Sequence, residues 1–177
     1  MLDREPLHFD RLARVWILRD PKEAPAKCTL IPLRGRPDVS FLSFDVDRRY
    51  AVEGAVLLHC DGEPLSREDA ARPLLVLDGA WRRVQTMMRR LDGRFVARSI
   101  PPGFETAYPR RSKTFEDPSA GLASIEALYL ALLATGSRDE SWLAAYRWRD
   151  EFLRLNAERI ARLAEHAPAQ APAADGA

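Results

Sequence analysis

Five short apolar segments in the first hundred residues constrain the fold of this chain more than any other feature of its sequence. Each is five or six residues long and rich in Val, Leu, Ile or Phe, which is typical of β-strands buried in a sheet. They are Arg14–Leu18, Val39–Phe44, Gly54–His59, Pro73–Leu77 and Phe95–Ile100. Helical patterns lie between and after these segments, so the order of elements predicts an α/β fold.

Four segments have the residue spacing of helices. Ser66–Ala71 begins with Ser followed by charged residues that include Glu and Asp, which is typical of a short helix start. Trp81–Leu91 has apolar residues at helical spacing, and Gly93 follows as a stop. Leu122–Thr135 is almost entirely apolar and predicts a buried helix, whereas Asp139–Glu165 predicts an amphipathic one.

The segments that remain are rich in Pro, Gly, Ala or charged residues. Pro101–Ala120 predicts a long connection, and long connections within a compact domain are often functional. From Ala167 onward the chain is rich in Ala and Pro, so it cannot bury a core and is expected to be disordered.

The composition excludes several classes of protein. A hydrophobic fraction of 46% and a charged fraction of 30% are those of an ordinary globular protein. No apolar run approaches the roughly 20 residues that span a bilayer. The first residues, Met1–Pro6, lack the apolar stretch of an export signal, so we expect a cytoplasmic protein. Cys28 and Cys60 are too few for a disulfide framework or a usual zinc site, and we expect two free thiols and no metal.

Charge is unevenly distributed although the formal net charge is only +1. Between Gly79 and Phe115 the only acidic residues are Asp92 and Glu105. The basic residues of the same segment are Arg82, Arg83, Arg89, Arg90, Arg94, Arg98, Arg110, Arg111 and Lys113. Guanidinium groups suit phosphate recognition, but a GC-rich genome would produce the same residues, so both interpretations stay open.

The strongest single candidate for a functional group is Asp78, which ends an apolar strand and is followed by a turn through Gly79 into a helix. In open α/β sheets, ligands bind beyond the carboxyl ends of the strands, where Asp78 is expected to lie. The alternative is that Asp78 caps the helix. Trp81 likewise has two interpretations, as a ligand contact or as a core anchor of its helix.

Two further segments are weaker candidates. The connection at Pro101–Ala120 leads into Leu122–Ala127, and free amides at a helix start favour anionic groups, although Ser124 or Glu126 could equally satisfy them. Near the N-terminus stand Asp20–Lys22 and Lys27–Thr29. The sequence has no phosphate-binding loop and no catalytic neighbour for any of its three histidines.

The order of these segments resembles one family, the SPOUT-class aminocarboxypropyltransferases that modify small-subunit ribosomal RNA in archaea and eukaryotes. The chain is also similar to the related DTW-domain proteins, which place the same group on tRNA uridines. The resemblance extends from about Arg14 to Asn156, and its specificity lies in the order and spacing of the motifs. The matching segments are Asp20–Lys22, Lys27–Thr29, Leu65–Asp69, Leu77–Trp81, Ala107–Arg111, Leu122–Ala127 and Tyr146–Asn156.

The resemblance implies a SPOUT-like fold with a C-terminal trefoil knot and two C-terminal helices. It implies an N-terminal α/β region on the RNA side at residues 1–72. A knotted region that binds S-adenosylmethionine would follow at residues 73–166, before the tail at residues 167–177. The implied reaction transfers the aminocarboxypropyl group of S-adenosylmethionine to a uridine or pseudouridine-type base and releases 5′-methylthioadenosine.

The resemblance also implies roles for individual residues. Asp78 is the candidate general base, or it orients the substrate base by accepting a hydrogen bond. The expected contacts to the cofactor are Thr29, Trp81, Ile100, Pro102, Tyr108, Leu122, Ala123 and Ser124. The expected contacts to RNA are Lys22, Lys27, Arg82, Arg83, Arg110 and Arg111. We expect an RNA partner, ribosomal RNA rather than tRNA, no membrane partner, and a monomer.

Three features depart from the family pattern. Ala80 stands where the family usually has Ser or Thr, Glu23–Ala26 separates two motifs that are normally contiguous, and Lys113–Gly121 is an insertion. Two alternative functions therefore remain open. One is a SPOUT RNA methyltransferase, and the other is a non-catalytic RNA-binding factor in ribosome assembly.

Overall fold

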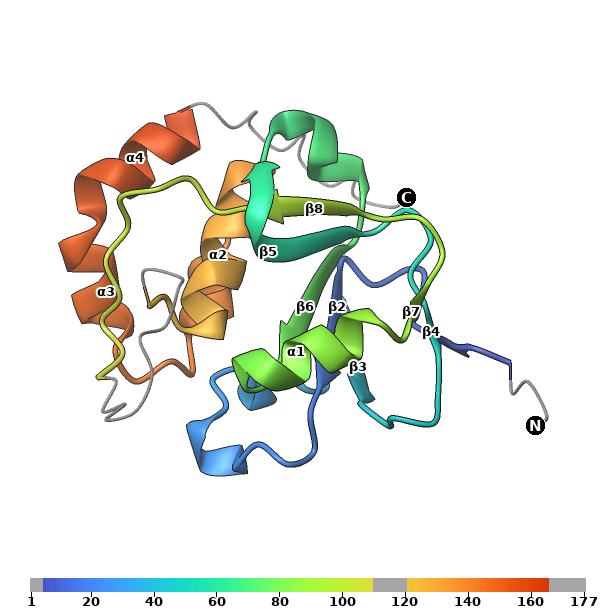
Figure 1. The fold of residues 1–177 in the computed structure, drawn as a ribbon. Helices are drawn as coiled ribbons and strands as arrows, with labels where there is room; N and C mark the ends of the chain where they lie inside the picture. The colour runs from blue at the N-terminus through green and yellow to red at the C-terminus, as the bar shows by residue number, and fades with distance from the viewer. Residues whose placement is uncertain (1–4, 110–120, 166–177) are drawn as a thin grey trace, which may run out of the picture.

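The computed structural model describes residues 5–109 and 121–165, which form an α/β fold (Figure 1). Its main sheet has five parallel strands in the order β3-β2-β6-β5-β8. These strands are β2 (Val15–Arg19), β3 (Val39–Ser43), β5 (Val56–Pro64), β6 (Leu74–Asp78) and β8 (Val96–Ser99). All five strand predictions are confirmed in position, although β5 continues well beyond its predicted end.

A second, smaller parallel sheet has the strand order β1-β4-β7. Its strands are only two residues long: β1 (Leu7–His8), β4 (Tyr50–Ala51) and β7 (Leu91–Asp92). Segments this short carry no alternation of apolar and polar residues, so the sequence did not predict this sheet.

The helical elements include four α-helices in the described residues. They are α1 (Trp81–Met88), α2 (Ser124–Ala134), α3 (Arg149–Leu155) and α4 (Ala157–Glu165). Short 3-10 helices are η1 (Pro25–Lys27), η2 (Ile31–Leu33), η3 (Arg67–Ala71) and η4 (Glu140–Leu143). No helix among the described residues combines the length and the apolar character needed to cross a membrane.

Two helix predictions are confirmed at Trp81 and Leu122, whereas the long helix predicted over Asp139–Glu165 is wrong. That segment is divided into η4, α3 and α4. The chain departs from helical geometry at or beside Tyr146 and Asn156, whose side chains make hydrogen bonds to other parts of the protein. The sequence predicts the amphipathic character of the segment but not these tertiary bonds.

The SPOUT-like fold with a C-terminal trefoil knot is corrected by the structure. The described residues form an α/β fold of parallel sheets with four α-helices, and they show no knot in residues 5–109 and 121–165. The periodicity of the sequence supported only the α/β class and the helices near the C-terminus. The knot came from the family resemblance, because a threaded chain leaves no local pattern of residues.

The main sheet is covered on both faces, as Figure 1 shows, with α2 on one side and α1 on the other. All five residues of β2 are buried, and its side chains alternate between two cores. Val15 and Ile17 pack with α2, Trp142 and Phe152. Trp16 and Leu18 pack on the opposite face with residues of α1 and the small sheet. This layered packing fixes the carboxyl ends of the central strands.

Candidate active site

The strand order of the main sheet reverses between β2 and β6. From β2 the chain continues to β3 on one side, whereas β5 and β8 lie on the other side of β6. Arg19 and Asp78 are register partners at the carboxyl ends of these two strands. Such a switch point is where open parallel sheets bind ligands, so Asp78 lies where the sequence predicted a functional acid.

The Asp78 carboxylate is buried and faces three other polar side chains. Cys28 donates from Sγ to Oδ2 at 2.8 Å, and Ser124 donates from Oγ to Oδ1 at 3.2 Å. The Nε atom of Arg19 lies 3.8 Å from Oδ2. The helix-cap interpretation of Asp78 is excluded, because the N-cap of α1 is Ala80.

The thiol of Cys28 is held in its protonated form. Burial raises the pKa of Cys28, and the hydrogen bond to Asp78 and the negative charge of Asp78 raise it further. A thiolate would place two negative charges side by side. Cys28 therefore acts as a hydrogen-bond donor that helps to orient Asp78.

Arg19 is a buried cation beside this carboxylate. Its residue is 7% exposed, and its guanidinium donates a hydrogen bond to the backbone carbonyl of Glu23. Its Nε is buried without a hydrogen-bond partner among the described residues. A buried guanidinium requires a negative partner, and Asp78 is the carboxylate within ion-pair distance. Arg19 thus links Asp78 to the segment that begins the first sequence insertion.

Arg83 forms a second ion pair at the same edge of the sheet. Its Nε donates to Oδ2 of Asp20 at 2.7 Å, and Asp20 is 1% exposed. Burial raises the pKa of Asp20, but the hydrogen bond and charge of Arg83, with the backbone amide of Lys22, outweigh it and hold this pKa below its ordinary value. Arg83 is therefore already paired with Asp20, and an RNA phosphate would have to compete with this carboxylate for the guanidinium.

One amide at the start of α2 is capped by a side chain from another segment. Thr29 accepts a hydrogen bond on Oγ1 from the backbone amide of Ile125 at 3.2 Å. Ser124, the first helical residue, contacts Asp78. The structure thus brings together Thr29, Ser124 and Asp78, three of the predicted site residues, and it gives Thr29 a structural role as a helix cap.

Glu126 joins this helix start to the loop after β8. Its side chain is completely buried and accepts four hydrogen bonds. Oε1 accepts from the amide of Ala107 at 2.9 Å and from the hydroxyl of Tyr146 at 2.8 Å. Oε2 accepts from the amide of Ala123 and the hydroxyl of Thr106, both at 2.7 Å. One carboxylate therefore connects three segments that are distant in the sequence.

Asn156 fixes the same loop one residue earlier. Its Oδ1 accepts from the amide of Glu105 and its Nδ2 donates to the carbonyl of Glu105, both at 2.8 Å. The ring of Tyr108 packs edge-on against Trp148 at 5.0 Å. Three of the matching motifs, which contain Ala107, Glu126 and Asn156, are thus held together by these contacts.

The remaining predicted cofactor contacts lie in different environments. Ile100, Tyr108 and Leu122 are partly buried against the core around α2, and Ala123 is buried in it. Trp81 is 44% exposed and belongs to neither core, so its interpretation as a core anchor is wrong. The Trp81 indole lies against the ring of His59, with 5.4 Å between centroids.

Glu23 and Ala80, which mark two departures from the family pattern, are in direct contact. Ala80 has no side-chain cap, and its backbone amide donates to Oε1 of Glu23 at 2.9 Å. A carboxylate at this position also interacts favourably with the positive end of the α1 dipole. The insertion thus supplies an acceptor at the helix start where the substituted residue has none.

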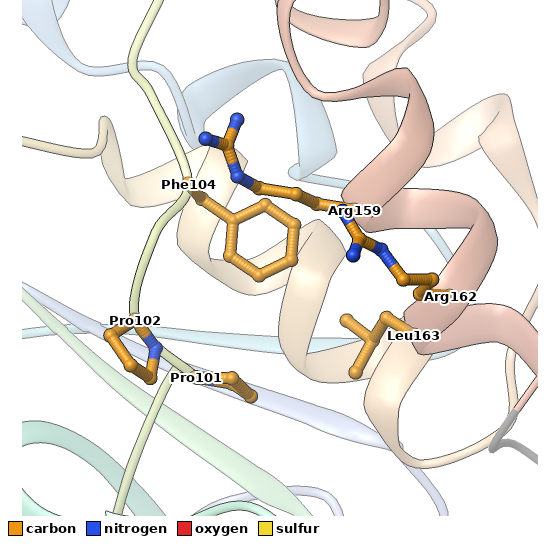
Figure 2. A pocket seen from close by; sticks show the side chains of 6 residues that line it. All are labelled: Pro101, Pro102, Phe104, Arg159, Arg162 and Leu163. Atoms are coloured by element: carbon orange, nitrogen blue, oxygen red, sulfur yellow. The ribbon is translucent and has the colours of Figure 1, made fainter.

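A hollow lies between the loop after β8 and α4 (Figure 2). Its walls are Pro101, Pro102, Phe104 and Leu163, with Arg159 and Arg162 beside them, and its volume is about 230 Å³. Cofactor pockets usually have volumes of about 300–1,000 Å³. Of the predicted cofactor contacts only Pro102 lines this open hollow, so it is not by itself a nucleoside site.

The predicted RNA contacts are only partly described. Lys22 and Arg82 are exposed, and no acidic side chain pairs with Arg82 in the part of the chain that the structure describes. The side chain of Lys27 and the whole of Arg110 and Arg111 lie outside the described residues. Among the described arginines predicted to contact RNA, Arg82 is therefore the one whose side chain is exposed and not paired with an acidic residue.

Sequence reasoning missed the residues that organise the site. Cys28 and Asn156 stand within the matching motifs, but nothing in the sequence showed that they contact Asp78 or the loop after β8. One interpretation of Glu126 was that it satisfies amides at the helix start, and its bond from the amide of Ala123 confirms this, but its bonds to the loop after β8 were not predicted. Arg19 carried a signal that could have been used. It occupies the last position of an otherwise apolar strand, where a buried charge requires a partner.

Comparison with known proteins finds a similar solved structure. No protein-family model matches the sequence, and no curated protein matches it. The structure is similar to that of the SAM-dependent rRNA:acp-transferase Tsr3 from Vulcanisaeta distributa, with a TM-score of 0.66 and 25% sequence identity. The match covers 88% of this chain and 85% of that protein. It supports the relation to ribosomal RNA aminocarboxypropyltransferases, but neither the SPOUT nor the DTW relation.

Proposed function

We propose that this protein transfers the aminocarboxypropyl group of S-adenosylmethionine to a uridine-type base of ribosomal RNA. The observation that carries the proposal is the similarity to the rRNA:acp-transferase Tsr3 over 88% of the chain. The convergence of the separate motifs around Asp78 and the start of α2 supports it. In this reaction a base nitrogen would bond to the γ-carbon of the transferred group, the carbon–sulfur bond would break, and 5′-methylthioadenosine would leave.

We assign Asp78 as the side chain that accepts the proton of the attacking nitrogen, or a hydrogen bond from it. A uracil-type N–H must lose its proton as the new bond forms, and a carboxylate can accept either that proton or a hydrogen bond from it. Cys28 and Ser124 each donate to one oxygen of Asp78 and leave further lone pairs on the carboxylate. The fixed orientation of Asp78 would supply catalysis by positioning.

The polar groups around Asp78 fit the amino-acid end of S-adenosylmethionine, which carries an ammonium and a carboxylate. The hydroxyl of Thr29 accepts from Ile125, which leaves its own hydrogen for a carboxylate oxygen. Ser124 and the first amides of α2 lie at the positive end of a helix. We assign these residues to that end of the cofactor, and the half-exposed indole of Trp81 to an apolar part of it.

The test is product analysis with purified protein, S-adenosylmethionine and ribosomal RNA. We expect 5′-methylthioadenosine in mass spectrometry and an equal amount of RNA that carries the added group. Asp78→Asn should bind the cofactor but transfer at least tenfold more slowly, because the amide keeps the shape and cannot take a proton. The matched control is Asp47→Asn, at an exposed position away from the site. S-adenosylhomocysteine as the product would instead establish a methyltransferase, and absence of cofactor binding would leave a non-catalytic RNA-binding factor.

The RNA-binding surface is tested by two neighbouring arginines. Arg82 is exposed and unpaired among the described residues, whereas Arg83 is tied to Asp20. Arg82→Gln should weaken RNA binding and reduce the dependence of affinity on salt, because fewer counterions are released. Arg83→Gln should mainly lower the stability of the fold. If the RNA affinity of Arg82→Gln depended on salt as that of the wild type does, α1 would not belong to the RNA-binding surface.

A further inference from the structure

A wide bulge interrupts β5 where it pairs with β8. Both Leu58 and Glu63 are paired with Arg98, so residues 59–62 are additional residues on the β5 side. Gly62 makes this geometry possible, because a Cβ atom there would lie 2.5 Å from the backbone nitrogen of Arg98. Consecutive side chains of a regular strand point to opposite faces, but a bulge redirects them.

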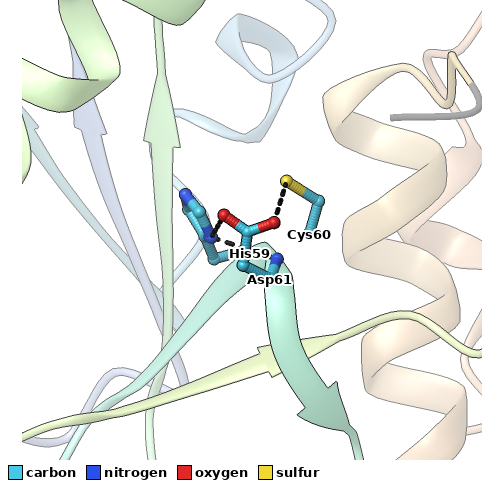
Figure 3. A group of neighbouring side chains, drawn as sticks. All are labelled: His59, Cys60 and Asp61. Carbon is cyan, nitrogen blue, oxygen red and sulfur yellow. Dashed lines mark hydrogen bonds and ion pairs between the residues drawn. The ribbon is translucent and has the colours of Figure 1, made fainter. Parts of the chain in front are cut away.

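The bulge brings together the side chains of His59, Cys60 and Asp61 (Figure 3). One imidazole nitrogen, the sulfur and a carboxylate oxygen all lie within 4.8 Å of one another. Sγ of Cys60 lies 3.7 Å from Oδ1 of Asp61, and Nδ1 of His59 lies 3.8 Å from Oδ2. Three consecutive residues thus present nitrogen, sulfur and oxygen donors at one place.

Nδ1 is the imidazole nitrogen of His59 that faces this cluster. Its lone pair accepts a hydrogen bond from the backbone amide of Asp61 at 3.2 Å, so a bound cation would take the place of that bond. In the neutral ring the hydrogen is therefore on Nε2, which is buried without a partner in the described part of the chain. The side chain is 8% exposed and lies against Trp81. The ring is held in place by this packing rather than by a second hydrogen bond.

We propose that His59, Cys60 and Asp61 bind one zinc-like divalent cation, with the fourth position of a tetrahedral site open to water or another ligand. Zinc–ligand distances place a nitrogen and an oxygen about 3.4 Å apart in such a site, and a sulfur and an oxygen about 3.6 Å apart. In the structure Nδ1 lies 3.8 Å from Oδ2 and Sγ lies 3.7 Å from Oδ1, so the exposed side chain of Asp61 must rotate to bring one oxygen to both donors. The donor set of one nitrogen, one sulfur and one oxygen suits zinc or cobalt.

Binding of the cation would release the thiol proton of Cys60 to solvent. An ordinary thiol is protonated at neutral pH, whereas the thiolate is the form that binds a metal ion. Affinity should therefore rise with pH as the thiol becomes easier to deprotonate.

The site is independent of the proposed transfer reaction but lies beside Trp81. His59 is the contact between the two, since its ring packs on the indole. A cation on His59 would hold the ring against Trp81 and bring a metal ion close to an exposed aromatic group. This proximity provides a second readout, because bound cobalt quenches the fluorescence of a nearby indole.

The test is a titration of the full chain with Co²⁺, followed by competition with Zn²⁺. We expect one equivalent to bind with a thiolate-to-cobalt absorption band in the near ultraviolet, and Zn²⁺ should remove that band. Cys60→Ser should abolish the band, and His59→Gln and Asp61→Asn should each weaken binding at least tenfold. The matched control is Cys28→Ser, whose sulfur contacts Asp78 and lies outside the cluster, and it should retain the band.

Fluorescence provides an independent check. Co²⁺ should quench part of the tryptophan emission, and Trp81→Phe should remove most of that quenching while binding remains. The proposal is overturned if wild-type protein shows no thiolate band. It is also overturned if Cys60→Ser keeps the band, or if Cys28→Ser loses it. Circular dichroism of each variant distinguishes a lost ligand from a lost fold. Transfer activity is not needed for any of these measurements.

Discussion

Replacement of Glu126 by Gln tests whether one buried carboxylate holds the site together. Gln has nearly the same shape, but it offers one acceptor oxygen and one amino group in place of two acceptors. In either orientation, the amino group faces a backbone amide, that of Ala107 or that of Ala123. The hydroxyls of Tyr146 and Thr106 can rotate to accept from it, but a backbone amide cannot.

The magnitude follows from these four bonds. A buried donor without an acceptor costs about 1–3 kcal/mol, and a bond to a charged group contributes about 1.5–3 kcal/mol. Glu126→Gln loses one backbone bond outright and weakens the others. Removal of a buried charge offsets part of this loss. We therefore expect the free energy of unfolding to fall by about 2–4 kcal/mol. For a protein of this length that is a decrease in melting temperature of about 4–16 °C.

The assay is urea unfolding followed by circular dichroism, together with calorimetric titration of S-adenosylmethionine. Cofactor affinity should fall as well, because Glu126 fixes the loop that contains Thr106 and Ala107. The matched control is Glu151→Gln on the exposed side of α3, which should leave both quantities within error. A stability within about 0.5 kcal/mol of wild type would refute the reasoning, since changes of that size are ordinary for surface substitutions.

Three further predictions concern the edges of the site. Asp20→Asn should lower the urea midpoint at pH 7. The pKa of Asp20 is depressed in the folded state, so protonation at low pH removes the stabilisation that the carboxylate provides. The difference in urea midpoint between wild type and Asp20→Asn should therefore shrink below about pH 4, and a midpoint difference that is constant with pH would contradict this reasoning. Gly62→Ala should reduce stability by about 1–3 kcal/mol in thermal unfolding, since β5 and β8 must separate to accommodate the new methyl group. In a Cys60→Ser background, the only thiol is Cys28, whose pKa is raised. Cys28 should therefore react slowly with iodoacetamide until the pH is well above the pKa of an ordinary thiol. Rapid alkylation of the folded protein at pH 8 would show that the pKa of Cys28 is not raised.

The strands were predictable because the sheet is buried on both faces. Strands such as β2 and β6 are nearly continuous apolar runs, and their length separates them from helices. Asp78 could also be placed, because the carboxyl ends of parallel strands meet at one edge of the sheet. A general rule for parallel sheets therefore predicted the position of Asp78, but it did not predict which side chains surround it.

The contacts of the site were not predictable from local pattern. The Asp78–Ser124 contact joins residues 46 positions apart, and the Glu105–Asn156 contact joins residues 51 positions apart. Periodicity reports which face of an element is buried, but not which distant group completes a hydrogen bond. For the same reason the break between α3 and α4 at Asn156 was missed, because the propensity of the segment alone favours an uninterrupted helix.

Two of the three departures from the family pattern, Ala80 and the insertion at Glu23–Ala26, meet in the structure. Glu23 belongs to the insertion, and its carboxylate accepts the amide of Ala80, where the family's hydroxyl is absent. Its carbonyl also accepts from Arg19, which lies beside Asp78. Ala80 is exposed and is followed directly by the half-exposed Trp81, whereas Asp78 and its partner Ser124 belong to the buried or partly buried interior. The two changes are therefore coupled at the outer side of the site, where we place the RNA. The inner contacts, which we assign to the donor of the transferred group, keep the residue types of the matching motifs.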